Sequence, residues 1–141
     1  MYDLMIIGSG PAGISAALTA KARNLNFIWF GSRALSTKIE KAEKIMNYPG
    51  LPAVTGSEMQ SVFLKQIDDC GITITESQVN SIYDCGGYFA AGADNEIYEA
   101  KAVIMTVGMT TTREIEGEAR LLGCGVSYCA TCDGALYKNK D

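Results

Sequence analysis

Histidine is missing from all 141 residues of this chain, and that absence narrows its chemistry. Proton transfer must then use a carboxylate, a thiol, a tyrosine, a lysine or a bound cofactor. Triads built on histidine and most catalytic zinc sites are excluded. The net charge is -4 and the basic residues form no stripe, so we expect no nucleic-acid partner.

Long hydrophobic runs are missing as well. The longest, Leu4–Ile7 and Ala102–Met105, fall far short of the roughly 18 residues that a membrane helix needs. The start, Met1-Tyr2-Asp3, has neither the basic segment nor the cleavage site of a signal peptide. We therefore expect no membrane association and a cytoplasmic location. In that compartment the five cysteines indicate redox or metal chemistry rather than a scaffold of structural disulfides.

The first 30 residues predict a strand, a helix and a second strand. Tyr2–Ile7 is mostly apolar and is followed at once by glycines, as in a buried parallel strand. Gly13–Asn24 has apolar residues at helical spacing, and Asn26–Phe30 is again strand-like. Together these segments predict a βαβ unit within an α/β domain.

The middle of the chain predicts one more helix and several strands. Gly31–Pro52 reads as an irregular connection, and Thr55 with Glu58 has capping-box spacing for a helix that Gly71 ends. Its apolar stripe comprises Met59, Val62, Phe63, Ile67 and Cys70. The predicted strands are Ile72–Glu76, a hairpin of Val79–Asp84 and Tyr88–Ala91 around Cys85–Gly87, an antiparallel Ile97–Ala100, and a buried parallel Ala102–Thr106.

The glycine-rich loop Gly8–Gly13 matches G-x-G-x-x-G between the first strand and the first helix. Gly8 allows the tight turn, Gly10 lets a pyrophosphate approach the backbone, and Gly13 lets helix and strand pack closely. The helix N-terminus would hold the anion with free N–H groups. This context favours a dinucleotide site over the alternative, a purely structural glycine turn.

The acid that usually binds the ribose is missing from the end of the second strand. Phe30-Gly31-Ser32 stands there, and the nearest carboxylates, Glu40 and Glu43, read as solvated charges. We therefore expect the ribose to be held by Ser32 or by backbone groups.

Cys129 and Cys132 form a C-x-x-C pair, followed directly by Asp133. Such thiols can have lowered pKa values, and Asp133 is the best placed acid/base for thiol–disulfide exchange. A zinc ribbon would need a second pair or histidines. Cys124, Cys129 and Cys132 do have plant-type iron–sulfur spacing, with Cys70 or Cys85 as the fourth ligand. A redox pair is favoured, while a metal cluster and an inert pair stay open.

Five runs follow one another along the chain: Gly8–Gly13, Asn47-Tyr48-Pro49-Gly50, Thr106-Val107-Gly108, Glu116-Gly117-Glu118 and Gly125–Gly134. Together they resemble the low-molecular-weight thioredoxin reductases, which are class II pyridine nucleotide-disulfide oxidoreductases. The resemblance spans the whole chain and implies a Rossmann-like FAD-binding fold with a parallel sheet and a small antiparallel β-layer over residues 1–112. Residues 113–141 would be a linker and the incomplete start of a second nucleotide-binding domain that carries the redox disulfide.

The resemblance also implies a role for each matched position. Cys132 would face the flavin, Cys129 would attack the substrate disulfide, and Asp133 would be the general acid. Gly31 and Ser32 would lie near the adenosine ribose. The remaining FAD-binding positions would be Gly8, Ser9, Gly10, Pro11, Ala12 and Gly13 at the diphosphate, Asn47 on the isoalloxazine side, Val79 at the adenine, and Thr106 and Gly108 lining the same site.

The implied function is an FAD-dependent reductase of a thioredoxin-like protein disulfide, homodimeric when full length. Ser36–Lys41 replaces the Gly-Gly-Gln stretch usual in the family and resembles a branch from anaerobes that uses ferredoxin, so NADPH and ferredoxin both stay open as donors. The alternatives are a reductase of another disulfide protein and a non-catalytic flavin- or nucleotide-binding module. Family members extend further, so we expect an N-terminal fragment that is inactive by itself.

Overall fold

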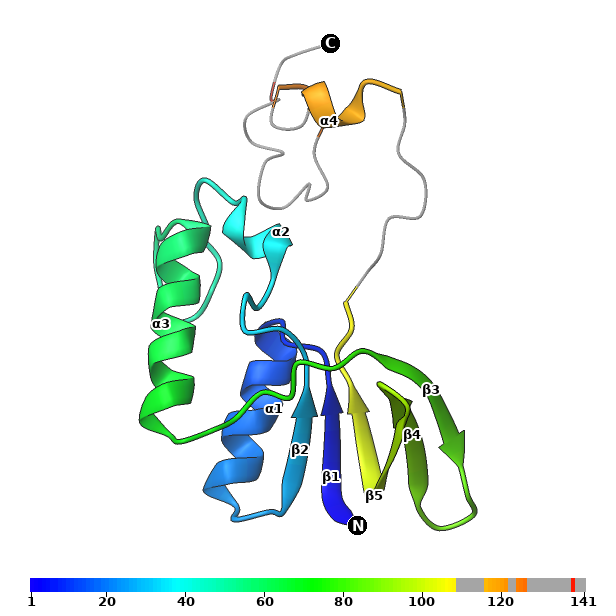
Figure 1. Cartoon of the computed structure of the whole chain (residues 1–141). Helices are drawn as coiled ribbons and strands as arrows, with labels where there is room; N and C mark the ends of the chain where they lie inside the picture. Colours follow the sequence, from blue (N-terminus) through cyan, green and yellow to red (C-terminus); the bar gives the residue numbers. More distant parts are fainter. Residues whose placement is uncertain (109–115, 122–123, 127–137, 139–141) are drawn as a thin grey trace.

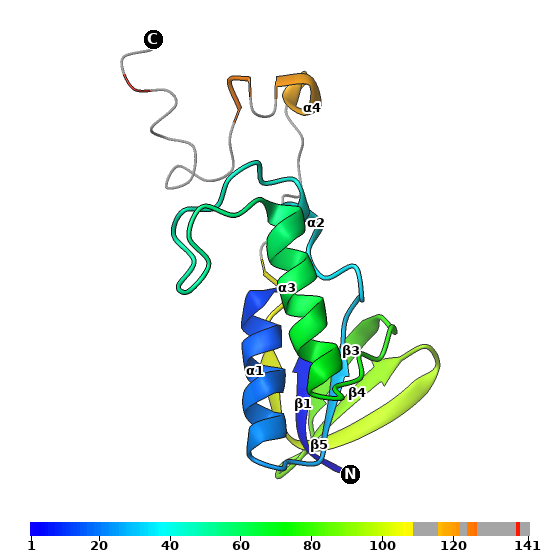
Figure 2. The ribbon, with the colours of Figure 1, turned by 90° about the vertical axis from the view of Figure 1, so that its left-hand side faces the viewer.

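The computed structural model describes residues 1–108, 116–121, 124–126 and 138. Its described strands form one five-stranded sheet in the order β2-β1-β5-β4-β3, with the helices α1 and α3 packed beside it (Figures 1 and 2). The elements are β1 Tyr2–Ile7, α1 Pro11–Ala22, β2 Phe27–Phe30, α2 Thr37–Glu40, α3 Gly56–Asp69, β3 Val79–Asp84, β4 Phe89–Ala93, β5 Glu96–Met105 and α4 Glu118–Leu121.

The centre of the sheet is parallel, as the sequence predicts. β1 lies between β2 and β5, with Ile7 opposite Phe30 on one side and Met105 on the other. Leu4 to Ile7 are buried, because Leu4 and Ile6 pack into the cluster that the helices cover and Met5 and Ile7 pack into a second cluster on the other face. The parallel strands therefore end together at one edge, which carries the glycine loop.

β5 corrects the prediction of two separate strands after the hairpin. It is one continuous strand that pairs antiparallel with β4 up to Ala100 and parallel with β1 from Ala100 onward. The antiparallel layer predicted for Val79–Ala100 is thus part of the same sheet. The predicted burial of Ala102–Thr106 is also wrong, since Ile104 and Met105 are 40% and 63% exposed. Beyond Ala100 the register with β4 has ended, so only β1 flanks this part of β5 among the described strands.

The predicted strand Ile72–Glu76 is reduced to a single parallel bridge between Thr75 and Phe30. The Thr75 N–H donates to Trp29 O at 2.7 Å and the Gly31 N–H donates to Thr75 O at 3.1 Å. At the start of the segment, the Ile72 N–H donates to Ile67 O of α3 rather than to a strand. Because the bridge is parallel, the next residue, Glu76, lies at the carboxyl edge of the sheet beside β2.

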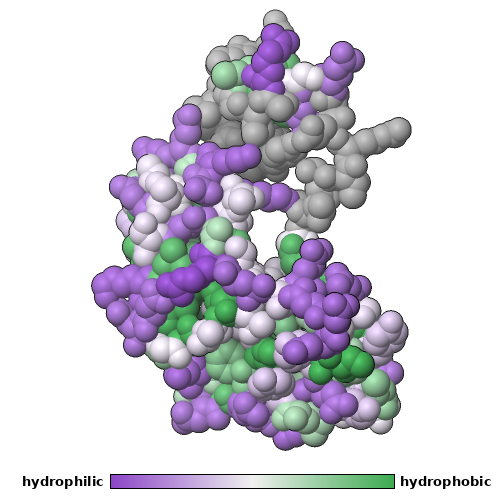
Figure 3. Space-filling view, viewed as in Figure 1, coloured by the Kyte–Doolittle hydropathy of each residue, from purple (hydrophilic) through white to green (hydrophobic). Residues whose placement is uncertain are grey.

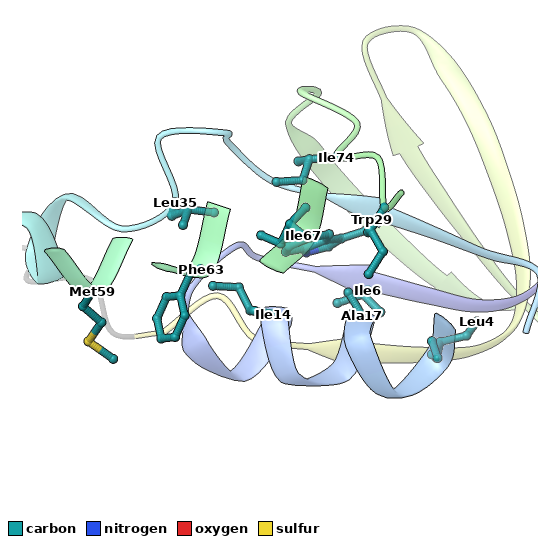
Figure 4. Close-up of a cluster of buried hydrophobic side chains, with 12 residues drawn as sticks. Leu4, Ile6, Ile14, Ala17, Trp29, Leu35, Met59, Phe63, Ile67 and Ile74 are labelled. Carbon is teal, nitrogen blue, oxygen red and sulfur yellow. The ribbon is translucent and has the colours of Figure 1, made fainter. Parts of the chain in front are cut away.

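The main core lies between the sheet and the helices α1 and α3 (Figure 4). From α3, Met59, Phe63 and Ile67 face it at four-residue spacing, which keeps them on one side of the helix. The wider predicted stripe is wrong at both remaining positions, because Val62 is 45% exposed and Cys70 is exposed at the helix C-cap. A second cluster on the other face of the sheet contains Met5, Ile7, Phe30 and Ala91.

The start of α3 confirms the predicted capping box. The Glu58 N–H donates to Thr55 Oγ1, and Glu58 Oε2 accepts from the Thr55 N–H at 2.8 Å. That backbone hydrogen bond lowers the pKa of Glu58 below its usual 4.5. The preceding connection is not wholly irregular as predicted, since it contains α2. A Cβ at Gly56 would overlap the Ile39 carbonyl, so only glycine lets α2 pack this closely on α3.

Polar residues cover much of the described surface in the view of Figure 3, with smaller apolar areas between them. Within the described residues, no helix has both the length and the apolar character to cross a membrane.

Candidate dinucleotide site

The loop Gly8–Gly13 joins the end of β1 to the start of α1, as predicted. Gly8 has φ +111°, and a Cβ there would lie 2.9 Å from Thr106 Oγ1. A Cβ at Gly13 would overlap the Gly8 carbonyl oxygen and lie 2.8 Å from the same Oγ1. Both glycines are therefore required by the packing of the loop against β5, independently of any ligand.

Gly10 differs from these two glycines. Its φ of -73° is open to any residue, and no atom lies within 4 Å of the Cβ it lacks. It is the N-cap of α1, where no side chain caps the helix, Pro11 occupies the first turn and no acid is present. Uncapped N–H groups and the helix dipole attract an anion. The missing side chain at Gly10 thus leaves the N-terminus of α1 open on this side.

The Gly8 carbonyl is held by side chains from two neighbouring strands. Trp29 Nε1 of β2 donates to it at 2.9 Å, and Thr106 Oγ1, which follows β5, donates to it at 3.0 Å. Thr106, predicted to line the site, therefore fixes the loop. Trp29 was missed by sequence reasoning, although a buried indole N–H needs an acceptor and could have indicated this contact.

Ser9 connects the glycine loop to the segment after β2. Its buried hydroxyl accepts from the Ser32 N–H at 3.0 Å and donates to Leu35 O at 3.2 Å. A Cβ at Gly31 would lie 2.6 Å from Ser9 Cβ. Ser32 Oγ accepts from the Ala34 N–H at 3.1 Å. Ser9, Gly31 and Ser32, all predicted site residues, are thus brought together.

The other predicted positions lie further apart. Asn47 is exposed in a loop closed by the bridge between Ile45 and Val54. Val79 begins β3 opposite Ala93, and Gly108 follows β5 with φ +69°. Among the hydrogen bonds of the described residues, none joins Asn47, Val79 or Gly108 to the glycine loop.

The predicted redox residues Cys129, Cys132 and Asp133 lie outside the described residues. Cys70, Cys85 and Cys124 are exposed free thiols, and the described part of the chain holds no group of three or more metal-binding side chains. At the predicted hairpin tip, a hydrogen bond with Cys85 raises the pKa of Tyr88 above its usual 10.0.

A second group of side chains, which sequence reasoning missed, follows the end of β2. Arg33 forms an ion pair with Asp68 of α3 at 2.8 Å through both carboxylate oxygens. The Arg33 backbone N–H donates to Glu76 Oε1 at 2.6 Å. Asp68 and Glu76 each lie more than 30 residues from Arg33 in the sequence, so only the fold brings the three residues together.

A βαβ unit with a glycine loop pinned at the carboxyl edge of parallel strands defines a Rossmann-like dinucleotide-binding fold. Residues 2–141 match the family described as pyridine nucleotide-disulphide oxidoreductase, and the chain belongs to that family.

Known relatives agree with this assignment. The thioredoxin reductase of Bacillus subtilis is 32% identical over 142 residues, covering 100% of this chain and 45% of the relative. A solved ferredoxin-flavin thioredoxin reductase of Clostridium acetobutylicum has 48% identity and a TM-score of 0.77, covering 96% of this chain and 47% of the other. For the Streptococcus pyogenes thioredoxin reductase the identity is 35% and the TM-score 0.80, over 96% of this chain and 45% of that one.

These structures confirm the predicted fold as the FAD-binding fold of the thioredoxin reductases, which combines a parallel sheet with an antiparallel part. The chain spans slightly less than half the length of the relatives it matches.

Proposed function

We propose that this chain supplies the FAD-binding part and the redox disulfide of a thioredoxin-disulfide reductase. The observation that carries the proposal is the uncapped N-terminus of α1 behind Gly10, where the glycine loop leaves room for a diphosphate. Family membership over residues 2–141 supports a flavoprotein disulfide reductase rather than a simple nucleotide-binding module.

Different described residues would contact different parts of the dinucleotide. Gly8 and Gly13 shape the loop, Thr106 fixes it, and Gly10 with the first turn of α1 binds the diphosphate. Ser32, whose hydroxyl proton is not used by its contact with Ala34, is available at the adenosine side. The bound FAD would supply a two-electron store between the electron donor and the disulfide.

The cysteine pair would then carry the exchange with the substrate. In the dithiol form, the Cys129 thiolate attacks one sulfur of the partner disulfide, and the released partner thiolate takes a proton from Asp133. The Cys132 thiol then loses its proton as its sulfur attacks the mixed disulfide at Cys129. This attack restores the Cys129–Cys132 disulfide and releases the second partner thiolate, which takes up that proton. Two electrons and two protons enter the partner in each cycle.

Ferredoxin is the proposed electron donor. The identity of 48% to a ferredoxin-flavin thioredoxin reductase, against 35% to the Streptococcus pyogenes thioredoxin reductase, favours it over NADPH. A thioredoxin-like substrate, a homodimeric state and a cytoplasmic location belong to the same proposal.

The first test is the absorbance spectrum of the purified protein, followed by turnover. Flavin bands near roughly 450 nm are expected, and the full-length protein should reduce thioredoxin with reduced ferredoxin. NADPH should give no turnover. A colourless protein that binds no added FAD would contradict the proposal, and turnover with NADPH alone would reverse the choice of donor.

The second test assigns the cysteines. In the full-length protein, Cys129→Ser and Cys132→Ser should each abolish turnover, and only the Cys132→Ser protein should trap a partner as a mixed disulfide. Cys70→Ser is the matched control, since Cys70 is a free exposed thiol at the C-cap of α3, and it should retain full activity. Trapping through Cys132 alone would reverse the two roles. Stoichiometric zinc or iron by elemental analysis would favour a metal cluster instead.

A further inference from the structure

The structure explains why no acid stands at the end of β2. Phe30 is the last residue of β2, so Gly31 has the position at which an acid usually binds the ribose. A Cβ at Gly31 would lie 2.6 Å from Ser9 Cβ and 2.9 Å from Ser9 Oγ. The Ser9 side chain therefore fills the space that an acidic side chain would need, and its own hydroxyl proton is directed to Leu35 O.

A carboxylate reaches the same edge from another segment. Thr75 bridges Phe30 in a parallel sense, so Glu76 directly follows the carboxyl end of that short pairing. Ligands of open α/β sheets bind outside the carboxyl ends of the strands. Glu76 Oε1 accepts from the Arg33 N–H at 2.6 Å, and the adjacent Ser32 N–H donates to Ser9 Oγ. Two hydrogen bonds from consecutive residues thus connect the carboxylate to the glycine loop.

Glu76 remains open to a ligand. Its side chain is exposed, and its second oxygen, Oε2, has no hydrogen bond among the described residues. A pocket of about 390 Å³ opens beside it, lined by Arg33, Asp68, Gly71, Ile72, Thr73, Ile74 and Glu76. The Arg33 guanidinium is paired with Asp68, so it does not neutralise Glu76 through an ion pair of its own.

We propose that Glu76 replaces the missing strand-end acid and accepts hydrogen bonds from the ribose hydroxyls of the adenosine half of the bound dinucleotide. This inference rests on the proposed FAD site. A free carboxylate oxygen accepts hydroxyl protons and repels a phosphate, so the same residue selects against nucleotides phosphorylated on that ribose.

The test compares FAD with an FAD analogue that lacks the 2′-hydroxyl of the adenosine ribose, using the intact apoprotein and fluorescence titration. The wild type should bind FAD at least about tenfold more tightly than the analogue, the range of a hydrogen bond to a charged group. Glu76→Gln should lose most of this preference and bind FAD with an affinity close to that of the analogue. Its amide oxygen still accepts from the Arg33 N–H, so a neutral NH₂ faces the ribose, and its hydrogen bond to a hydroxyl oxygen lacks the charge assistance of the carboxylate.

Glu99→Gln is the matched control, because it removes an equal charge from the antiparallel part of β5. It should keep the wild-type preference. A Glu76→Gln protein that retains the preference, or a wild type that binds both ligands equally, would overturn the assignment of Glu76 while leaving the FAD site intact. A wild type that binds neither ligand would contradict the proposed function itself.

Discussion

The two glycines at the start of α1 should respond differently to the same substitution. Gly13→Ala introduces a methyl group that overlaps the Gly8 carbonyl and lies 2.8 Å from Thr106 Oγ1. Gly10→Ala introduces the same methyl group where no atom lies within 4 Å. We predict that the first substitution mainly lowers stability, whereas the second mainly weakens the binding of FAD.

The magnitudes follow from the contacts of Gly8. For the methyl group of Gly13→Ala to fit, the Gly8 carbonyl must move away from Trp29 Nε1 and Thr106 Oγ1, which costs about 1 kcal/mol for each hydrogen bond. Strain from overpacking adds about 1–3 kcal/mol, and the better helix propensity of alanine returns about 1 kcal/mol. Gly13→Ala should therefore lower the free energy of unfolding by about 2–4 kcal/mol.

At Gly10 the opposing effects nearly cancel. Alanine restricts the unfolded chain, which stabilises by about 0.4–1 kcal/mol, but it is a poorer N-cap than glycine by a similar amount. The net change should stay within about 0.5 kcal/mol. The methyl group would nevertheless stand where the backbone must approach the pyrophosphate, so FAD should bind at least about tenfold more weakly.

Urea unfolding of the apoprotein and FAD titration separate the two effects. With an m-value of about 1–3 kcal/mol/M, Gly13→Ala should lower the midpoint by about 1–2 M, while Gly10→Ala leaves it almost unchanged. An unchanged midpoint for Gly13→Ala would refute the assigned contact with Gly8. Wild-type FAD affinity in Gly10→Ala would refute the phosphate site.

Three further substitutions or conditions test the scaffold. Thr55→Ala should cost about 1 kcal/mol in urea unfolding, because it removes the cap of α3. Trp29→Phe keeps an aromatic ring but loses the hydrogen bond to Gly8 O, so a cost of about 1 kcal/mol and weaker FAD binding are expected. The hydrogen bond from Lys101 lowers the pKa of Asp3 below its usual 3.8, so this pair stabilises the fold above that pH and less as the pH falls below it. Lys101→Met should flatten this part of the pH profile.

The glycine loop could be predicted from the sequence because its context is local. The strand, the glycines and the helix follow one another within the first 24 residues, and each has a signal of its own. The capping box at Thr55 and Glu58 was equally readable and is confirmed. Such features need no knowledge of which segments meet in space.

Features that depend on pairing were predicted less well. The sequence does not reveal that β5 changes partner at Ala100, and the charged Lys101 interrupts its apolar residues there, so its two halves looked like separate strands. The burial of Val62 and Cys70 depends on the angle at which α3 meets the sheet, and the helical stripe alone made both look buried. The short α2 depends on Gly56, whose packing against Ile39 leaves no local pattern.

The candidate site combines residues that are far apart in the sequence because each follows the end of a strand or bridge at the same edge. Gly8 follows β1, Gly31 follows β2, Glu76 follows the bridge at Thr75, and Thr106 follows β5. Parallel strands share their carboxyl ends, so these four positions must converge once the sheet forms. A carboxylate that is missing at one of these positions can then be supplied from another. Because Ser9 fills the space beside Gly31, the carboxylate can stand at Glu76 but not at Gly31.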